Sequence, residues 1–356
     1  MKNIKIMGGG LSGLTAAINL TQAGYNVDVF EKKDDCGARF HGDLEGLENW
    51  TSQTDVTNEL KSMNIKINFD FKPFKKMYIS DGEKLIECTS KTKKPVFYLV
   101  RRGVVRNSLD QGLKNQALDE GVNIHFNAKA KKEDMDVISI GPAENKPVGV
   151  AKGVHFETET DDIAVALLNS EASHLGYCYL LINKGFGCIC SVNMIPMKHN
   201  VNDYFKKTYK IFNQLLDIDI KNPGDFSGVG CFLIQPRLIE GNKIYTGEAA
   251  GLQDFLWGFG MRYAMISGFL AATSIIEDKD YKKLIENQIL GRVKTSLVNR
   301  FLLERLGNYY PIFLIKHGEK NRHWWKEALY SVTNPSLHSR ILYPFAKLNF
   351  VVKFML

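Results

Sequence analysis

Three glycines near the start of the chain constrain its fold more than any other feature. Gly8, Gly10 and Gly13 follow an apolar run, and Glu31 lies eighteen residues after Gly13. This spacing predicts a strand, a tight turn, a helix that ends near Gly24, and a second strand that ends in an acid. Gly8 permits the sharp turn, Gly10 lets the backbone approach a pyrophosphate, and Gly13 lets the helix pack against the strand. Such a unit binds the ADP half of a dinucleotide.

The expected cofactor contacts in this unit are backbone amides and one acid. The free amides and the partial positive charge of a helix N-terminus attract phosphate. A carboxylate at the end of the second strand accepts hydrogen bonds from ribose hydroxyls. The first set of expected cofactor-binding residues is Gly8, Gly10, Leu11, Ser12, Gly13, Glu31 and Lys32.

Length and cysteine content set the broad class of the protein. The 356 residues are enough for two lobes or for one large domain with an insertion. No apolar run reaches the ~18 residues of a membrane-spanning helix, so we expect a cytoplasmic protein. The six cysteines contain no Cys-x-x-Cys pair. Buried free thiols are therefore expected, and a metal site is not.

Positive charge is concentrated at the C-terminal end of the chain. From Arg292 onward there are eleven Lys or Arg and three Glu, a net charge of +8, which leaves −1 for the preceding 291 residues of a chain that totals +7. Aromatic and apolar runs at 309–315, 341–345 and 350–356 interleave with these cations. The pattern suits peripheral binding to an anionic membrane surface, and equally a helical lobe with solvated cations. Nucleic acid is not an expected partner, because no recognisable binding module accompanies the charge.

A second glycine-rich segment lies far downstream of the first. The expected strand 244–246 leads into the turn Gly247-Glu248-Ala249-Ala250-Gly251, and a helix of small residues follows over about 259–276. An acid at a strand end can bind ribityl hydroxyls, and helix-start amides can face the flavin edge on which negative charge builds during reduction. The expected ligand therefore extends from an ADP unit to FAD. The expected cofactor-binding residues here are Gly247, Glu248, Gly258, Gly260 and Met261.

These segments together resemble the geranylgeranyl reductase family, within the hydroxybenzoate-hydroxylase-like FAD fold. The family's glycine fingerprint is similar to residues 8–13, and its Gly-Asp-Ala-Ala-Gly turn is similar to residues 247–251. Its arginine loop and following helix resemble Arg101 and residues 109–121. Its aromatic strand ending in Phe-Pro-Lys-Gly resembles residues 177–185. The resemblance covers most of residues 1–275.

Three departures from the family pattern concern the site. Glu248 replaces the usual Asp, and Leu181 and Ile182 stand where the family often has Phe and Pro. The family's cysteine after the arginine has no clear match beside Arg39. The resemblance nevertheless implies that Arg39 and Arg101 belong to the cofactor-binding residues.

The motifs and the strand and helix pattern predict an α/β fold in which two domains are interleaved. We expect a discontinuous Rossmann-type FAD-binding domain with a parallel sheet, formed by residues 1–70, 101–145 and 240–277. An antiparallel-sheet substrate domain is expected over 71–100 and 146–239. A basic, aromatic helical region is expected over 278–356. Within the first domain, the spacing of apolar residues predicts a helix over 45–65.

The resemblance implies reduction of isolated carbon–carbon double bonds in an isoprenoid or lipid chain. Reduced flavin supplies the hydride, and water or a side chain supplies the proton. Because an alkene carries no charge, we expect an apolar tunnel lined by the antiparallel sheet, with Tyr177, Tyr179 and Trp257 near the flavin. His41 is the candidate proton donor, since its loop follows the ribose-binding strand. Each of these four side chains also fits an ordinary structural role.

Two other functions stay open. A flavin monooxygenase or halogenase shares the fold, but residues 139–142 lack the Asp-Gly motif of many NAD(P)H-using hydroxylases, and the halogenase Trp-x-Trp-x-Ile-Pro signature is missing. No second glycine fingerprint for a nicotinamide is found, which favours a separate electron donor: NAD(P)H, ferredoxin or another reductant. The basic aromatic C-terminal region motivates the other alternative, a membrane-docked flavoprotein for electron transfer or lipid binding.

Overall fold

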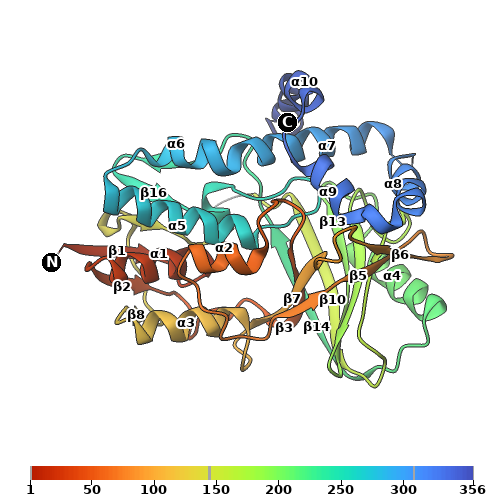
Figure 1. The fold of residues 1–356 in the computed structure, drawn as a ribbon, viewed down its shortest axis with the longest axis horizontal. Helices are drawn as coiled ribbons and strands as arrows, with labels where there is room; N and C mark the ends of the chain where they lie inside the picture. The colour runs from red at the N-terminus through yellow and green to blue at the C-terminus, as the bar shows by residue number, and fades with distance from the viewer. Residues whose placement is uncertain (1, 143–145, 308, 356) are drawn as a thin grey trace.

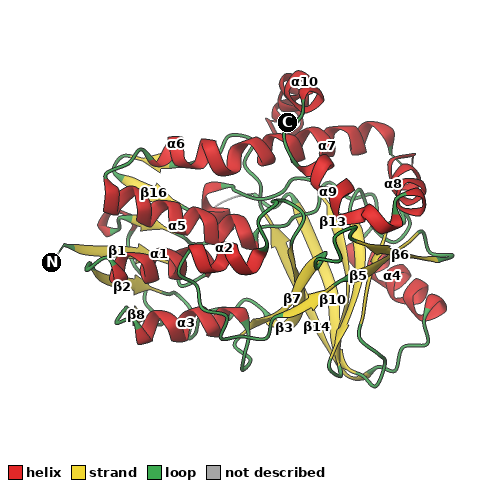
Figure 2. Ribbon diagram, in the orientation of Figure 1, coloured by secondary structure: helices red, strands yellow, loops and turns green. Residues whose placement is uncertain are grey.

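A parallel sheet surrounded by helices forms one half of the molecule (Figures 1 and 2). The computed structural model describes residues 2–142, 146–307 and 309–355; residues 1, 143–145, 308 and 356 of the predicted domains lie outside this part. The strand order is β15-β16-β9-β1-β2-β8, and only β15 runs antiparallel to its neighbour. These strands are β1 (Asn3–Met7), β2 (Asn26–Phe30), β8 (Asn123–His125), β9 (Val137–Ile138), β15 (Ile239–Glu240) and β16 (Lys243–Tyr245).

Helix α1 (Leu11–Gln22) is the central helix of this half. It contacts β1, β2, α3 (Leu109–Asp119) and α5 (Met261–Glu277), and most of its residues are buried. The contact with α5 is close, because a Cβ on Gly268 would lie only 2.1 Å from the Ser12 carbonyl oxygen. The small residues of the predicted 259–276 helix are thus explained by its packing against α1. The predicted strand-turn-helix-strand unit at the N-terminus is confirmed.

A seven-stranded sheet forms the other half, in the order β14-β10-β13-β12-β11-β5-β6. Only the pair of β11 and β5 is parallel, so the predicted antiparallel sheet is confirmed. Helix α4 (Val201–Leu215) covers one face through Phe212. The strands are β5 (Lys76–Ser80), β6 (Leu85–Thr89), β10 (Gly149–Glu157), β11 (Ile163–Leu167), β12 (Tyr177–Asn183), β13 (Phe186–Met194) and β14 (Lys221–Gly230).

A small three-stranded sheet connects the two halves. Its order is β3-β7-β4, from β3 (His41–Glu48), β7 (Phe97–Gly103) and β4 (Lys72–Phe74). Strand β3 contacts both β13 and α5, and Figure 1 shows β3 and β7 between the helical half and the large sheet. The predicted helix over 45–65 is therefore wrong: only α2 (Val56–Ser62) is helical there. Antiparallel pairing with β7, distant in sequence, overrides the local helical spacing.

The C-terminal region is helical, as predicted, and in Figure 1 α6 lies along the top of the parallel-sheet half while α7 continues toward the large sheet. Helix α10 packs on α7, while α8 and α9 contact strands β5 and β6 of the large sheet. A bilayer-spanning helix is absent from the described residues, because none combines the needed length with the needed apolar character. The elements are α6 (Tyr281–Ile285), a π-helical turn (Glu286–Leu290), α7 (Gly291–Leu306), α8 (Tyr309–Lys320), η4 (Arg322–Trp324), α9 (Trp325–Thr333) and α10 (Leu337–Met355).

Candidate cofactor and substrate site

The first glycine turn lies at the carboxyl ends of the parallel strands, where such sheets bind ligands. Gly8 has a φ of +102°, and a Cβ there would lie 2.5 Å from the Ser139 carbonyl oxygen. A Cβ on Gly13 would lie 2.1 Å from the Gly8 carbonyl oxygen. A Cβ on Gly10, in contrast, would meet no described atom within 4 Å. Gly8 and Gly13 thus permit the turn itself, whereas Gly10 leaves open space at the start of α1.

This open space has the features of a phosphate site. Gly10 is the N-cap residue of α1 and has no side chain to cap the helix. Leu11 and Ser12 form the first turn behind it and are buried. Their backbone amides and the helix dipole favour an anion at this position.

Glu31 lies beside the glycine turn, at the end of β2. Its Oε2 accepts a hydrogen bond from the Gly9 amide at 2.8 Å, and its Oε1 accepts one from the Lys33 amide at 2.8 Å. Lys32 is exposed next to it. The acid is therefore held against the turn, at the position from which a ribose contact is predicted.

The second glycine turn meets the first. It forms the short helix η2 (Gly247–Ala250), directly after β16. A Cβ on Gly247 would lie 2.9 Å from the Ser12 hydroxyl oxygen, and the Gly247 amide donates to Ser267 Oγ at 2.8 Å. Two motifs that are far apart in the sequence therefore lie in contact at the same edge of the parallel sheet.

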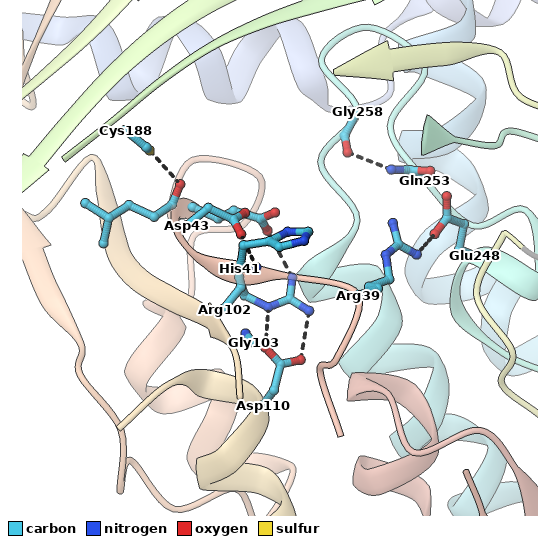
Figure 3. A network of polar contacts seen from close by, with 12 residues as sticks. Arg39, His41, Asp43, Arg102, Gly103, Asp110, Cys188, Glu248, Gln253 and Gly258 are labelled. Carbon is cyan, nitrogen blue, oxygen red and sulfur yellow. Dashed lines mark hydrogen bonds and ion pairs between the residues drawn. The ribbon is translucent and has the colours of Figure 1, made fainter. Parts of the chain in front are cut away.

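Arg39 and Glu248 form an ion pair at this surface. Arg39 Nη1 lies 3.2 Å from Glu248 Oε2, and Figure 3 shows the arginine turned toward the acid. Glu248 Oε1 also accepts a hydrogen bond from the Cys231 amide at 3.0 Å. Burial raises the pKa of Glu248, and the Arg39 charge opposes this increase. Both predicted cofactor-binding side chains thus lie together.

The loop before α5 presents two further glycines. Asp254 holds this loop: its carboxylate accepts from the Trp257 amide, and its carbonyl oxygen accepts from the Gly258 amide at 3.0 Å. Burial raises the pKa of Asp254 to about 6. Gly258 has a φ of +76° with no described atom near its Cβ position, and Gly260 is the N-cap of α5 without a capping side chain. A second helix N-terminus is therefore available to a ligand.

A cavity of about 280 Å³ separates this loop from the large sheet. Its wall includes residues of β10, β11, β12 and β13 on one side and residues 256–261 on the other. The charged and histidine side chains of its lining all come from one segment, residues 39–45: they are Arg39, His41, Asp43 and Glu45. The predicted residues that line this cavity are Arg39, His41, Tyr177, Tyr179, Trp257, Gly258, Gly260 and Met261.

A smaller cavity of about 90 Å³ lies next to the main one. The two share lining residues that include Trp50, Tyr177 and Trp257. Beyond them, the smaller cavity passes under α8 and α9 of the C-terminal region, and its lining is almost wholly apolar. Its residues there are Leu314, His317, Trp325, Ala328, Leu329 and Val332.

The three predicted aromatic residues form one wall. The ring centroids of Tyr177 and Trp257 are 5.5 Å apart with an edge-to-face geometry, and those of Tyr177 and Tyr179 are 6.1 Å apart. Burial raises the pKa of both tyrosine phenols. Both therefore stay neutral at physiological pH and offer an uncharged surface.

Two acids of the cavity were missed by the sequence analysis. Asp43 accepts a hydrogen bond from the His41 amide at 2.9 Å, and Glu45 Oε2 lies 2.9 Å from Arg102 Nη1. Burial raises the pKa of Glu45, and the Arg102 charge opposes this increase. Arg102 in turn forms a buried two-point pair with Asp110, at 2.9 and 3.0 Å (Figure 3). The helix predicted over 45–65 hid Glu45, which a strand prediction would have placed on the same face as His41 and Asp43.

Arg101 lies apart from the cavity lining. Its Nε donates to the Gly42 carbonyl oxygen at 3.2 Å, and its guanidinium lies 4.1 Å from the centroid of the Phe186 ring. The neighbouring Arg102 instead is the arginine that reaches the cavity acid Glu45. A contact of Arg101 with cofactor stays a prediction.

The fold and the site together define a class of protein. A glycine turn after β1 and an acid after β2 form a Rossmann-type dinucleotide-binding unit. A second glycine turn after β16 and an apolar cavity under an antiparallel sheet lie next to this unit. The Rossmann-like unit is also identified by a family model, that of the NAD(P)-binding Rossmann-like domain, which matches residues 6–44.

Three solved structures with this fold are similar over nearly the whole chain. A geranylgeranyl bacteriochlorophyll reductase-like protein from Thermoplasma acidophilum is 17% identical, with a TM-score of 0.71 over 100% of this chain and 99% of that one. A flavin-dependent brominase is 15% identical, with a TM-score of 0.64 over 98% and 99%. A p-nitrophenol 4-monooxygenase from Pseudomonas putida is 14% identical, with a TM-score of 0.63 over 95% and 100%. The predicted α/β architecture and the resemblance to the reductase family are thus confirmed at the level of the fold.

Proposed function

We propose that this protein is an FAD-dependent oxidoreductase that reduces carbon–carbon double bonds of an isoprenoid or lipid substrate. The lining of the main cavity is the observation that carries this proposal. Apart from the segment 39–45, its walls are mostly aliphatic, aromatic or glycine, and the smaller cavity extends them under α8 and α9. A flexible hydrocarbon matches such walls, because an isolated alkene brings no polar group that needs a partner.

The two glycine turns are the proposed FAD site. Gly10 and the start of α1 would take the pyrophosphate, and Glu31 would take the adenosine ribose. Glu248 and the turn from Gly258 to Gly260 would contact the ribityl chain and the polar edge of the ring. The chemistry that FAD supplies when bound is hydride transfer. A separate donor, either NAD(P)H, ferredoxin or another reductant, would supply the electrons.

The acids of the 39–45 segment are the proposed source of the proton that alkene reduction also needs. Glu45 is the stronger candidate, because it lines the cavity and burial raises the pKa of its carboxyl. Its contact with Arg102 fixes its position on β3. His41 lines the same cavity and is the second candidate. The neutral wall of Tyr177 and Trp257 would exclude water from the bond being reduced.

An anaerobic turnover assay tests this function. FAD-loaded protein is reduced with dithionite, mixed with lipids that carry geranylgeranyl chains, and the lipid is analysed by mass spectrometry. We expect a gain of two hydrogens for each bond reduced, together with reoxidation of the flavin. Reoxidation without a saturated product would contradict the proposal and favour the electron-transfer alternative.

A monooxygenase or halogenase reaction is the second candidate, and the fold shared with the brominase and the nitrophenol monooxygenase favours it. The same assay separates the two functions when it is repeated in air with bromide and a phenol. A brominated or hydroxylated phenol, with no saturated lipid in the anaerobic arm, would replace the reductase proposal.

A further inference from the structure

Helix α10 leaves an apolar stripe exposed along its length. Five large side chains are separated by four, four, three and four residues, which puts them on one face of the helix. Each is between 51% and 71% exposed, so the stripe is not covered by the rest of the protein. The stripe consists of Leu337, Ile341, Phe345, Leu348 and Val352.

The opposite side of α10 is apolar as well. Ala346 and Phe350 are buried in the main hydrophobic core, and Leu342 and Tyr343 pack against it. A helix that is apolar on both sides is typical of one that is covered on both sides, by protein or by lipid. A spanning role is excluded for the described residues, so the stripe needs a partner that lies along the protein surface.

We infer that the α10 stripe docks this protein on an anionic lipid bilayer. Residues 337–355 contain no Asp or Glu, and their cations are Arg340, Lys347 and Lys353, of which Lys353 pairs with Glu304 of α7 at 3.0 Å. The whole segment from Arg292 onward carries a net charge of +8. Cations beside an apolar stripe complement anionic headgroups above an acyl interior. A second copy of the chain is a poorer fit, because pairing two such stripes would bring like charges together.

The other exposed apolar residues of this region and the smaller cavity agree with this partner. Ile312 and Phe313 of α8 and Trp324 of η4 are exposed as well, and Trp is enriched at membrane interfaces. The same α8 contributes Leu314 and His317 to the smaller cavity. A bilayer at this region would therefore lie next to an apolar route toward the main cavity. The inference does not depend on which reaction the protein catalyses.

Vesicle binding by the full chain tests the inference. Purified protein is sedimented with phosphatidylcholine vesicles, with and without phosphatidylglycerol, and its bound fraction is measured. We expect binding only where phosphatidylglycerol is present, and weaker binding at high salt. The double variant Ile341→Glu/Phe345→Glu should lower the partition coefficient by roughly a hundredfold, since it removes two apolar contacts and adds repulsion.

The double variant Ile67→Glu/Leu118→Glu is the matched control. Both residues are exposed by 44–45% elsewhere on the protein, and the pair changes the net charge by the same amount. We expect it to bind vesicles within about threefold of the parent chain, because both substitutions lie outside the basic C-terminal region and salt screens their repulsion from the bilayer beyond a Debye length. Thermal unfolding and FAD titration show whether each variant is folded. Absence of parent binding, equal losses in both double variants, or a dimer that only the α10 variant dissociates would overturn the inference.

Discussion

Gly10 and Gly24 offer a matched pair for separating cofactor binding from stability. A Cβ at either position would meet no described atom within 4 Å, so neither alanine creates a clash. Gly10 has a φ of −86°, which alanine adopts readily, whereas Gly24 has a φ of +88° in the left-handed region. Gly10→Ala should therefore leave the stability of the fold unchanged and weaken FAD binding. Gly24→Ala should destabilise the fold and leave FAD binding unchanged.

The magnitudes follow from the local structure. For Gly10→Ala, the reduced freedom of the unfolded chain contributes about 0.4–1 kcal/mol. This offsets the loss of about 0.5–1 kcal/mol from a poorer N-cap residue. The new methyl group projects into the space assigned to the pyrophosphate. Loss of one charge-assisted hydrogen bond there costs about 1.5–3 kcal/mol, which weakens FAD binding roughly ten- to hundredfold.

Two measurements decide the matter. Flavin fluorescence titration gives the Kd for FAD, and urea denaturation of the FAD-free protein gives the free energy of unfolding. Gly24→Ala should lower the free energy of unfolding by about 1–2 kcal/mol and leave the Kd unchanged. If Gly10→Ala binds FAD with the parent Kd, the start of α1 does not hold the pyrophosphate and the reasoning fails.

Three further predictions concern buried charges. Burial raises the pKa of Glu48 from 4.5 to about 7, and its Oε2 has no hydrogen-bond partner among the described residues. The folded state therefore binds the Glu48 proton more tightly than the unfolded state does. The free energy of unfolding, measured by urea denaturation, should fall by roughly 3 kcal/mol as pH rises from 4.5 to about 7. The variant Glu48→Gln should show no such fall. Arg102→Met leaves Asp110 buried without its partner and should cost roughly 3–5 kcal/mol in the same assay. Glu45→Gln should lower the rate of lipid saturation roughly 10²–10⁴-fold and flatten its pH profile, with unchanged FAD binding.

The parts of the fold that could be predicted from the sequence are those set by short-range sterics. Gly8 and Gly13 are required by contacts within one turn, and Glu31 follows at the end of the neighbouring strand. The hairpin of β12 and β13 follows in the same way from the turn at 183–185. The meeting of Gly247 with Ser12 depends instead on the strand order of the sheet, which local patterns do not determine.

The cavity acid Glu45 was missed for a related reason. Leu47, Trp50 and Leu60 have helical spacing, yet the segment before Glu48 pairs with β7, more than fifty residues away in the sequence. Propensity cannot anticipate a pairing partner at that distance. Local patterns also could not show that Arg102, rather than Arg101, contacts Glu45. Successive side chains of a strand point to opposite faces, so the two arginines of β7 lie on different sides of the sheet. One step in register decides which arginine reaches Glu45.

The charges around the cavity bear on which of the two candidate reactions the protein performs. Two arginines at or beside the cavity already have an acid: Arg39 pairs with Glu248, and Arg102 forms a two-point pair with Asp110. A phenolate, the reactive form of a phenol in hydroxylation, would have to compete with these acids for positive charge. A neutral alkene needs no cation, and an acid with a raised pKa is suited to give it a proton. These charges are the reason for which we propose reduction of an uncharged chain rather than oxidation of an acidic ring.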